Sequence, residues 1–141
     1  MRFWDTSALV PMLINEPTAA ACQRLLVEDQ RILAWWGTYV ECVSAIARRQ
    51  RDGTLAADQA RHATLLLEML SAEWSLVEPS DEIVVIAARL VRRYPLSAAD
   101  ALQLAAAWRG SGEDPQPLAF VCLDQRLRDA ADHEGFTLLP R

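Results

Sequence analysis

Met1-Arg-Phe-Trp-Asp-Thr-Ser-Ala-Leu9 opens the chain and decides which fold the rest of the sequence is compared with. A short apolar strand, residues 2–4, is followed directly by the carboxylate of Asp5 and the hydroxyls of Thr6 and Ser7. In an open parallel sheet, ligands bind just beyond the carboxyl ends of the strands, and helices also begin there. Asp5 is therefore either the cap of the next helix or part of a binding site.

Short apolar strands alternate with helical segments through the rest of the chain. Further strands are expected at residues 31–34, 74–77, 118–123 and 136–139. Helices are expected at residues 7–14 with an interruption at Pro11, from Pro17 through Leu26, and at residues 38–52, 55–72, 80–93, 97–109 and 125–133. Strands separated by helices need crossover connections, which produce a parallel sheet. The sequence thus predicts the α/β class, as a three-layer α/β/α fold with a central parallel sheet of about five short strands.

The composition is that of one globular domain spanning residues 1–141, with 52% hydrophobic and 23% charged residues. No apolar run reaches the ~18 residues of a membrane span. Asp5 comes too early for the apolar core of a signal peptide, so we expect a cytoplasmic protein. The three cysteines form no Cys-x-x-Cys pair, which favours reduced, buried thiols over a zinc or disulfide framework.

Two further aspartates belong with Asp5. Asp124 follows the apolar segment 120–123, so in a parallel sheet it emerges at the same edge as Asp5, although it also fits a helix cap. Asp100 lies in a helix that is apolar on almost every face, where Ser97, Asp100 and Gln103 form the only polar stripe. A capping box with Ser97 explains this spacing but not the apolar surroundings, so a functional role for Asp100 is favoured.

Glu41 is the fourth candidate, on the expected helix 38–52. It lies opposite the apolar face predicted from Val40, Val43 and Ile46, and alone it is best interpreted as a solvated glutamate. Several acids above one sheet edge, however, would repel one another by roughly 4 kcal/mol per pair at ~4 Å and an effective dielectric constant of 20. A cation is needed, and an all-oxygen site without His or Cys suits Mg²⁺ or Mn²⁺. Such an ion polarises a phosphate and turns bound water into a nucleophile.

These motifs together resemble a PIN domain, and in particular the VapC-type toxins of bacterial toxin–antitoxin pairs. The resemblance rests on Asp-Thr-Ser-Ala-Leu at residues 5–9, Glu41 on the third major helix, Ala-Ala-Asp-Ala-Leu-Gln-Leu-Ala-Ala-Ala at residues 98–107, and Leu-Asp-Gln-Arg-Leu at residues 123–127. It covers essentially the whole chain.

The resemblance implies a metal-dependent endoribonuclease that cleaves RNA phosphodiester bonds with Mg²⁺ or Mn²⁺. Its catalytic acids would be Asp5, Glu41, Asp100 and Asp124, of which Asp5, Asp100 and Asp124 would hold the metal. Ser7 is expected to orient Asp5 or a water, with Thr6 as a second supporting hydroxyl. The family often places Thr or Ser two residues before the last acid, and here that position is Cys122, a weaker hydrogen-bond donor.

Partners follow from the same resemblance: an RNA substrate, a small cognate antitoxin that covers the site, and a homodimer. The net charge of −5 argues against a broad basic face, so RNA would be bound by a local rim of arginines. Arg48, Arg126 and Arg128 are the candidates. Trp35-Trp36 and the ridge from Leu65 to Leu70 are more apolar than a monomer surface should be, so each is either a partner surface or part of the core.

Three alternatives differ in class. A phosphoryl-accepting receiver domain also has acids above a parallel sheet, but that family requires a lysine and this chain contains none. A degenerate, non-catalytic PIN-like binding module is the second, favoured by Cys122. A housekeeping PIN nuclease without an antitoxin is the third, and only the neighbouring reading frame would distinguish it from a toxin.

Overall fold

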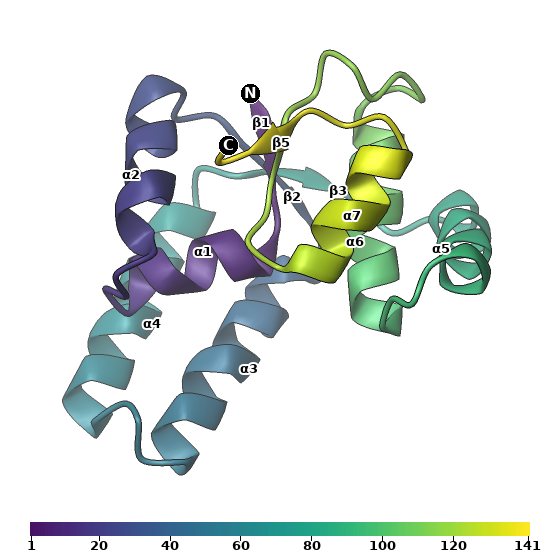
Figure 1. Ribbon diagram of the computed structural model, residues 1–141. Helices are drawn as coiled ribbons and strands as arrows, with labels where there is room; N and C mark the ends of the chain where they lie inside the picture. The colour runs from purple at the N-terminus through teal and green to yellow at the C-terminus, as the bar shows by residue number, and fades with distance from the viewer.

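The computed structural model describes residues 1–141 and contains a five-stranded, all-parallel sheet flanked by helices (Figure 1). The strands are β1 (Arg2–Trp4), β2 (Ile32–Trp35), β3 (Ser75–Val77), β4 (Phe120–Val121) and β5 (Leu138–Leu139), in the spatial order β3-β2-β1-β4-β5. Successive strands are added on one side of β1 and then on the other. The carboxyl ends of β1 and β4 therefore form a topological switch point, where open α/β sheets bind ligands.

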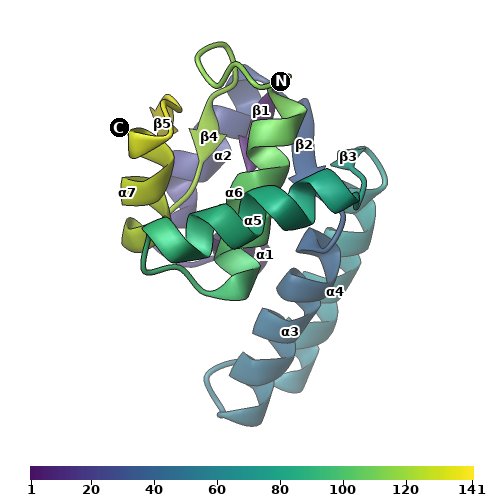
Figure 2. The same ribbon diagram turned by 90° about the vertical axis from the view of Figure 1, so that its right-hand side faces the viewer.

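Seven helices cover the two faces of the sheet, as Figure 2 shows from the side. They are α1 (Thr6–Leu13), α2 (Ala19–Glu28), α3 (Thr38–Arg51), α4 (Ala57–Ser71), α5 (Asp81–Arg93), α6 (Ala98–Gly110) and α7 (Gln125–His133). Helices α1 to α4 share one core cluster with Trp4 and Val121, and α5 to α7 share the other with Phe3 and Phe120. This alternation of neighbouring strand residues between two cores is the signature of a three-layer fold, so the predicted fold class is confirmed.

Helix α6 is alanine-rich because it is covered on nearly all sides. Its residues Ala101, Ala105, Ala106 and Ala107 are fully buried between the sheet and its neighbouring helices. At Gly110 a Cβ atom would lie 2.8 Å from Leu33 Cδ2 and 3.0 Å from Val77 Cγ2, so a larger residue would require these two side chains to shift. We expected Gly110 to close the helix; it is instead the last helical residue, and packing explains its identity.

The structure corrects two boundaries near the start of the chain. Pro11 does not interrupt α1, because a single lost backbone donor is tolerated where the proline ring is buried in the core. The next helix begins at Ala19 and not at Pro17. The reason lies at the end of α1, where Asn15 adopts a left-handed conformation (φ 55°) and the N–H of Glu16 donates to Pro11 O at 2.9 Å. This Schellman-type turn redirects the chain before α2 can start.

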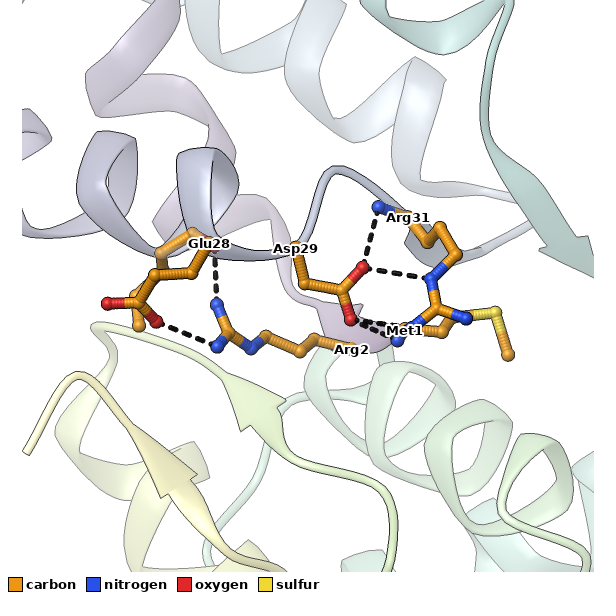
Figure 3. A network of polar contacts seen from close by, with 6 residues as sticks. Met1, Arg2, Glu28, Asp29 and Arg31 are labelled. Carbon is orange, nitrogen blue, oxygen red and sulfur yellow. Dashed lines mark hydrogen bonds and ion pairs between the residues drawn. The ribbon is translucent and has the colours of Figure 1, made fainter.

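A polar network fixes the start of β1 beside the loop that enters β2 (Figure 3). The amino group of Met1 and the Arg31 side chain both pair with Asp29, and Arg2 pairs with Glu28 at 2.8 Å. Hydrogen bonds from Arg31 hold the pKa of Asp29 well below its usual range. These contacts set the register of β1, whose other end carries Asp5.

None of the helices combines the length and the apolar character needed to cross a membrane.

Candidate active site

The four predicted acids line one cavity of about 920 Å³. It lies beyond the carboxyl ends of β1 and β4, where the N-terminal ends of α1, α3 and α7 meet (Figure 1). Asp5 and Asp124 follow the strands, Glu41 comes from α3, and Asp100 comes from α6. Side chains that are up to 119 positions apart in the sequence, Asp5 and Asp124, thus share one space. The sequence argument for a common sheet edge agrees with this placement.

Asp5 is the most buried of the four, with 4% of its surface exposed. It is the N-cap of α1: its Oδ2 atom accepts the backbone N–H of Ser7 at 2.9 Å and also the Ser7 hydroxyl. Burial raises the pKa of Asp5 to about 6, against the lowering effect of these hydrogen bonds, and the charges of Glu41 and Asp100 raise it further. The ionised form of Asp5 is therefore costly unless a cation is nearby.

Ser7 connects the two strand ends that carry Asp5 and Asp124. Its Oγ atom donates to Asp5 and accepts the backbone N–H groups of Leu123 at 2.9 Å and Asp124 at 3.2 Å. One hydroxyl therefore fixes the distance between the end of β1 and the segment after β4. This geometry agrees with the orienting role expected for Ser7.

Asp124 and Asp100 are also helix caps. Asp124 caps α7 through Oδ1, which accepts the N–H of Leu127 at 2.9 Å. Asp100 forms a capping box with Ser97, whose hydroxyl donates to Asp100 Oδ2 at 2.7 Å. Asp100 is half-buried and lines the cavity, so the expectation that it lies buried among alanines and leucines is wrong. The first turn of α6 projects beyond the packed part of that helix, and the capping and cavity-lining roles coexist.

Glu41 is half-buried and is not directed into solvent. Its Oε2 atom accepts hydrogen bonds from Thr6 Oγ1 at 2.8 Å and from Gln103 Nε2 at 2.9 Å. Burial raises the pKa of Glu41, the two hydrogen bonds lower it, and the charge of Asp100 raises it. Thr6, expected only as a supporting hydroxyl, thus contacts Glu41 directly.

The face of α3 that we predicted to be buried is correct at Ile46 and wrong at Val40 and Val43. Val40 and Val43 are 66% and 37% exposed, whereas Thr38, Cys42 and Ile46 are buried. The polar Thr38 belongs to the buried face because it meets a polar partner on α6, and a hydrophobicity pattern alone does not reveal such a pairing. Glu41 lies next to this buried face.

Gln103 is the residue that the sequence reasoning missed. It is 1% exposed, and its Nε2 atom lies within hydrogen-bond distance of Glu41, Thr6 and Thr38. The signal was present in the polar stripe of Ser97, Asp100 and Gln103, of which only Asp100 was assigned a role. A glutamine inside an apolar helix needs buried hydrogen-bond partners, and two of the partners of Gln103, Thr6 and Glu41, line the cavity.

Each of the four carboxylates has one oxygen held by the protein and one that accepts no hydrogen bond from it. The held atoms are Asp5 Oδ2, Glu41 Oε2, Asp100 Oδ2 and Asp124 Oδ1. The only buried side-chain nitrogen or oxygen atoms without a hydrogen-bond partner are the indole nitrogens of Trp4 and Trp74. The four remaining carboxylate oxygens are not among them, so they are not fully buried. The cavity therefore presents four accessible carboxylate oxygens on anchored side chains.

This donor set fits Mg²⁺ or Mn²⁺ in chemistry but is not a closed cage. No three His, Cys, Asp or Glu side chains are gathered closely enough to ligate one ion together. Mg²⁺ keeps several waters and is usually bound through one or two carboxylates, so an open all-oxygen arrangement suits it better than Zn²⁺. The high pKa of Asp5 is a further sign that this cavity favours a cation.

Cys122 contacts Asp5 from the buried interior of the protein. It is fully buried, with Sγ 3.6 Å from both Asp5 Oδ2 and the backbone oxygen of Asp124. Burial and the charge of Asp5 raise the pKa of the thiol far above its usual value, so it stays protonated and donates weakly. The stronger support for the strand ends comes from Ser7, which limits the consequence of the missing Thr or Ser.

The candidate RNA-binding arginines differ in environment. Arg48 is exposed, lines the cavity and makes no ion pair, while the neighbouring Arg49 pairs with Glu16. Arg126 is exposed but outside the cavity lining. Arg128 donates to three backbone oxygens, of Cys122 at 2.7 Å, Leu139 at 3.1 Å and Pro140 at 2.9 Å, and so holds the end of the chain against β4.

The two adjacent tryptophans have different environments. Trp35 is 7% exposed and belongs to the core, whereas Trp36 is 55% exposed and lines the cavity.

Comparison with known proteins agrees with this arrangement. The family model described as "PIN domain" matches residues 2–132. The chain belongs to the PIN domain family. PIN domains are typically nucleases. Among curated proteins, no sequence matches this PIN domain.

Three solved structures share the fold. A chain of a toxin–antitoxin complex from Klebsiella pneumoniae has 15% identity and a TM-score of 0.64, covering 89% of this chain and 88% of its own. The protein PAE2754 from Pyrobaculum aerophilum has 21% identity and a TM-score of 0.64, covering 98% and 83%. FitAcB from Neisseria gonorrhoeae has 20% identity and a TM-score of 0.63, covering 99% and 97%.

Proposed function

We propose that this PIN domain is a metal-dependent endoribonuclease and the toxin of a type II toxin–antitoxin pair. The observation that carries the proposal is the set of four carboxylates around one cavity, each anchored through one oxygen and accessible through the other. A binding module that had lost catalysis would have no reason to keep four anchored acids with unpaired oxygens. The family supports nuclease activity, and the Klebsiella pneumoniae toxin–antitoxin complex supports the toxin role.

Asp5, Asp100 and Asp124 would hold one or two divalent ions, each through one or two carboxylates, with water completing the coordination. When bound, Mg²⁺ or Mn²⁺ polarises the phosphate and lowers the pKa of a bound water. The Oε1 atom of Glu41 would orient an attacking water and accept its proton as the water oxygen bonds to phosphorus, and the leaving ribose oxygen would take a proton from solvent as its P–O bond breaks. The raised pKa of Glu41 suits it to this role, because a more basic carboxylate accepts a proton more readily.

The substrate would be single-stranded RNA held at the rim of the cavity. Arg48 is the best placed cation, since it is exposed, unpaired and part of the cavity lining, and Arg126 is a more distant second. The exposed indole of Trp36 offers a surface on which a base can stack. Arg128 is occupied by backbone oxygens, so its contribution is to the shape of the site.

A protein partner would cover part of this surface, as an antitoxin covers a toxin. Val40, Leu65 and Met69 on the α3–α4 hairpin are 66%, 53% and 72% exposed, and apolar side chains of this size are unusual on a surface that never meets a partner. The antitoxin and a second copy of the chain, as a homodimer, are the proposed partners.

Asp5→Asn and Asp100→Asn test the catalytic proposal. Each should fold normally, because asparagine is as good a helix cap as aspartate, yet lose Mg²⁺-dependent cleavage of single-stranded RNA. Glu73→Gln changes an exposed acid outside the cavity and is the matched control. Full activity in either folded cavity variant would contradict the assignment.

Two further measurements separate the alternatives. Calorimetric titration with Mn²⁺ should show binding to the wild-type protein and weaker binding to Asp5→Asn, whereas a degenerate module need show none. Expression in bacteria should arrest growth, and coexpression of the neighbouring small reading frame should relieve the arrest. Cleavage activity without growth arrest would point to a housekeeping nuclease.

A further inference from the structure

Gln103 is a buried polar residue placed between three elements of the site. It lies on α6, is 1% exposed, and faces Thr6 at the start of α1 and Thr38 and Glu41 at the start of α3. Its Nε2 atom lies 2.9 Å from Glu41 Oε2 and 3.1 Å from the hydroxyl oxygens of Thr6 and Thr38. It contacts neither Asp5, Asp100 nor Asp124, so any effect on chemistry must pass through Glu41 or its neighbours.

The chemistry of the partners fixes which way the amide faces. An ionised carboxylate accepts hydrogen bonds only, so the NH₂ end of Gln103, and not its carbonyl oxygen, must face Glu41. The carbonyl oxygen of the Gln103 amide also has a partner, because the Thr38 hydroxyl lies 3.5 Å from Oε1 and is able to donate to it. Glutamine supplies both a donor and an acceptor here, which an apolar residue does not.

Glu41 has no cationic partner to hold it in place. Its contacts are two neutral donors, Thr6 Oγ1 at 2.8 Å and Gln103 Nε2 at 2.9 Å, and both meet the same oxygen, Oε2. Binding both donors at one oxygen holds Oε2 in place and leaves Oε1 without a protein partner, on a side chain that lines the cavity. A neutral donor does this without adding a positive charge that would compete with a metal ion.

We propose that Gln103 is a positioning residue for Glu41, whose amide holds Oε2 so that Oε1 is presented to the water in the cavity. Its consequence for catalysis rests on the nuclease function proposed above, but the contact itself does not. The simpler alternative is that Gln103 only joins α6 to α1 and α3 and contributes to stability alone. Under that alternative, any loss of activity would follow the loss of folded protein.

Gln103→Met and Thr38→Val form a matched pair of tests. Methionine keeps the length of the side chain and removes both its donor and its acceptor, so Glu41 loses one of its two anchors. Thr38→Val keeps the shape of the side chain and removes one contact of Gln103 that does not involve the Glu41 carboxylate. We expect Gln103→Met to lower kcat by about 10- to 100-fold, the usual effect of removing a residue that orients a site ligand, with KM for RNA little changed. Thr38→Val should lower stability with kcat near the wild-type value.

A double-mutant cycle decides whether the effect acts through Glu41. In a Glu41→Gln background, Gln103→Met should cause no further loss of kcat, because the group it positions is already altered. Equal losses in both backgrounds, or losses in Gln103→Met and Thr38→Val that track their thermal midpoints, would overturn the proposal.

A spectroscopic measurement keeps the test independent of activity and of the folding of Gln103→Met. Glu41 is half-buried, so Glu41→Gln should fold. The NMR resonances of the side-chain amide protons of Gln103 should change position in Glu41→Gln and change far less in Asp100→Asn. Unchanged amide resonances in Glu41→Gln would overturn the positioning role. If these protons shift but the wild-type protein cleaves no RNA and binds no Mn²⁺, the proposed function fails and the contact stands.

Discussion

Replacing Asp5 with asparagine should make the metal-free protein more stable at neutral and alkaline pH. Burial raises the pKa of Asp5 from 3.8 to about 6, so the folded state binds this proton more tightly than the unfolded state does. Stability contributed by such a group is fully present below about pH 4 and is lost as the pH rises through about 6. At about 1.4 kcal/mol for each pKa unit, ionised Asp5 costs the folded state about 3 kcal/mol at pH 8.

Asparagine removes this cost while keeping the cap. Its carbonyl oxygen can take the place of Asp5 Oδ2, which accepts the N–H and the hydroxyl of Ser7, and its NH₂ group then takes the place of the unpaired Oδ1. The full difference of about 3 kcal/mol corresponds to a rise in thermal midpoint of roughly 10 °C for a domain of this size. The increase should be largest at pH 8 and small near pH 4.

Thermal and urea unfolding in EDTA, from pH 4 to pH 8, measure this difference directly. The wild-type and Asp5→Asn curves should come close together at the acidic end, because at pH 4 Asp5 is protonated in the folded wild-type protein and partly protonated in the unfolded chain. A stability difference that is constant across this range, or an Asp5→Asn variant that is less stable at pH 8, would refute the reasoning. Added Mn²⁺ should reverse the order at pH 8, since an ion at about 1,000 times its Kd adds about 4.1 kcal/mol to the wild-type protein, more than the cost of ionised Asp5.

Three further predictions concern residues around the cavity. Ser7→Ala should cost roughly 1–3 kcal/mol in urea unfolding and lower cleavage, because it leaves the N–H groups of Leu123 and Asp124 without their acceptor; unchanged stability would argue against the link between strand ends. Arg128→Met removes hydrogen bonds to three carbonyls, so hydrogen exchange at β5 should accelerate before that at β1, and uniform exchange would contradict a local role. Trp36→Ala should weaken binding of single-stranded RNA by about 1–3 kcal/mol with little effect on kcat, and a loss of kcat alone would place the indole elsewhere in the reaction.

The sequence was sufficient to predict the architecture and the position of two acids. Alternating strands and helices require crossovers, and crossovers require parallel strands, so the residues that follow β1 and β4 had to emerge at the same edge. Asp5 and Asp124 are therefore predictable from local patterns alone. The bounds of helix α7 are also predicted to the residue, because the cap at Asp124 marks its start and Gly135, two residues after His133, marks its end.

The environment of Glu41 was not predictable in this way. Its orientation depends on where α3 meets α6, which is a tertiary contact between residues 62 positions apart in the sequence. The apolar residues Val40 and Val43 suggested the wrong buried face, because the true one includes Thr38 and is completed by a polar contact to Gln103. Hydrophobic periodicity identifies apolar interfaces and gives no information on a polar one.

Asp5 can be both a helix cap and a site residue, because a carboxylate has two oxygens. A cap uses one oxygen to accept backbone N–H groups, and in Asp5, Asp100 and Asp124 the second oxygen remains accessible. Capping thus fixes where the free oxygen lies, since the helix N-terminus holds the side chain in one orientation. Glu41, like Asp100, lies within the first turn of its helix, but the N-cap of α3 is Gly37, which has no side chain to hold Glu41 as Ser97 holds Asp100, so its anchoring has to come from other residues. Thr6 and Gln103 supply it, which explains why a glutamine is buried in an otherwise apolar helix.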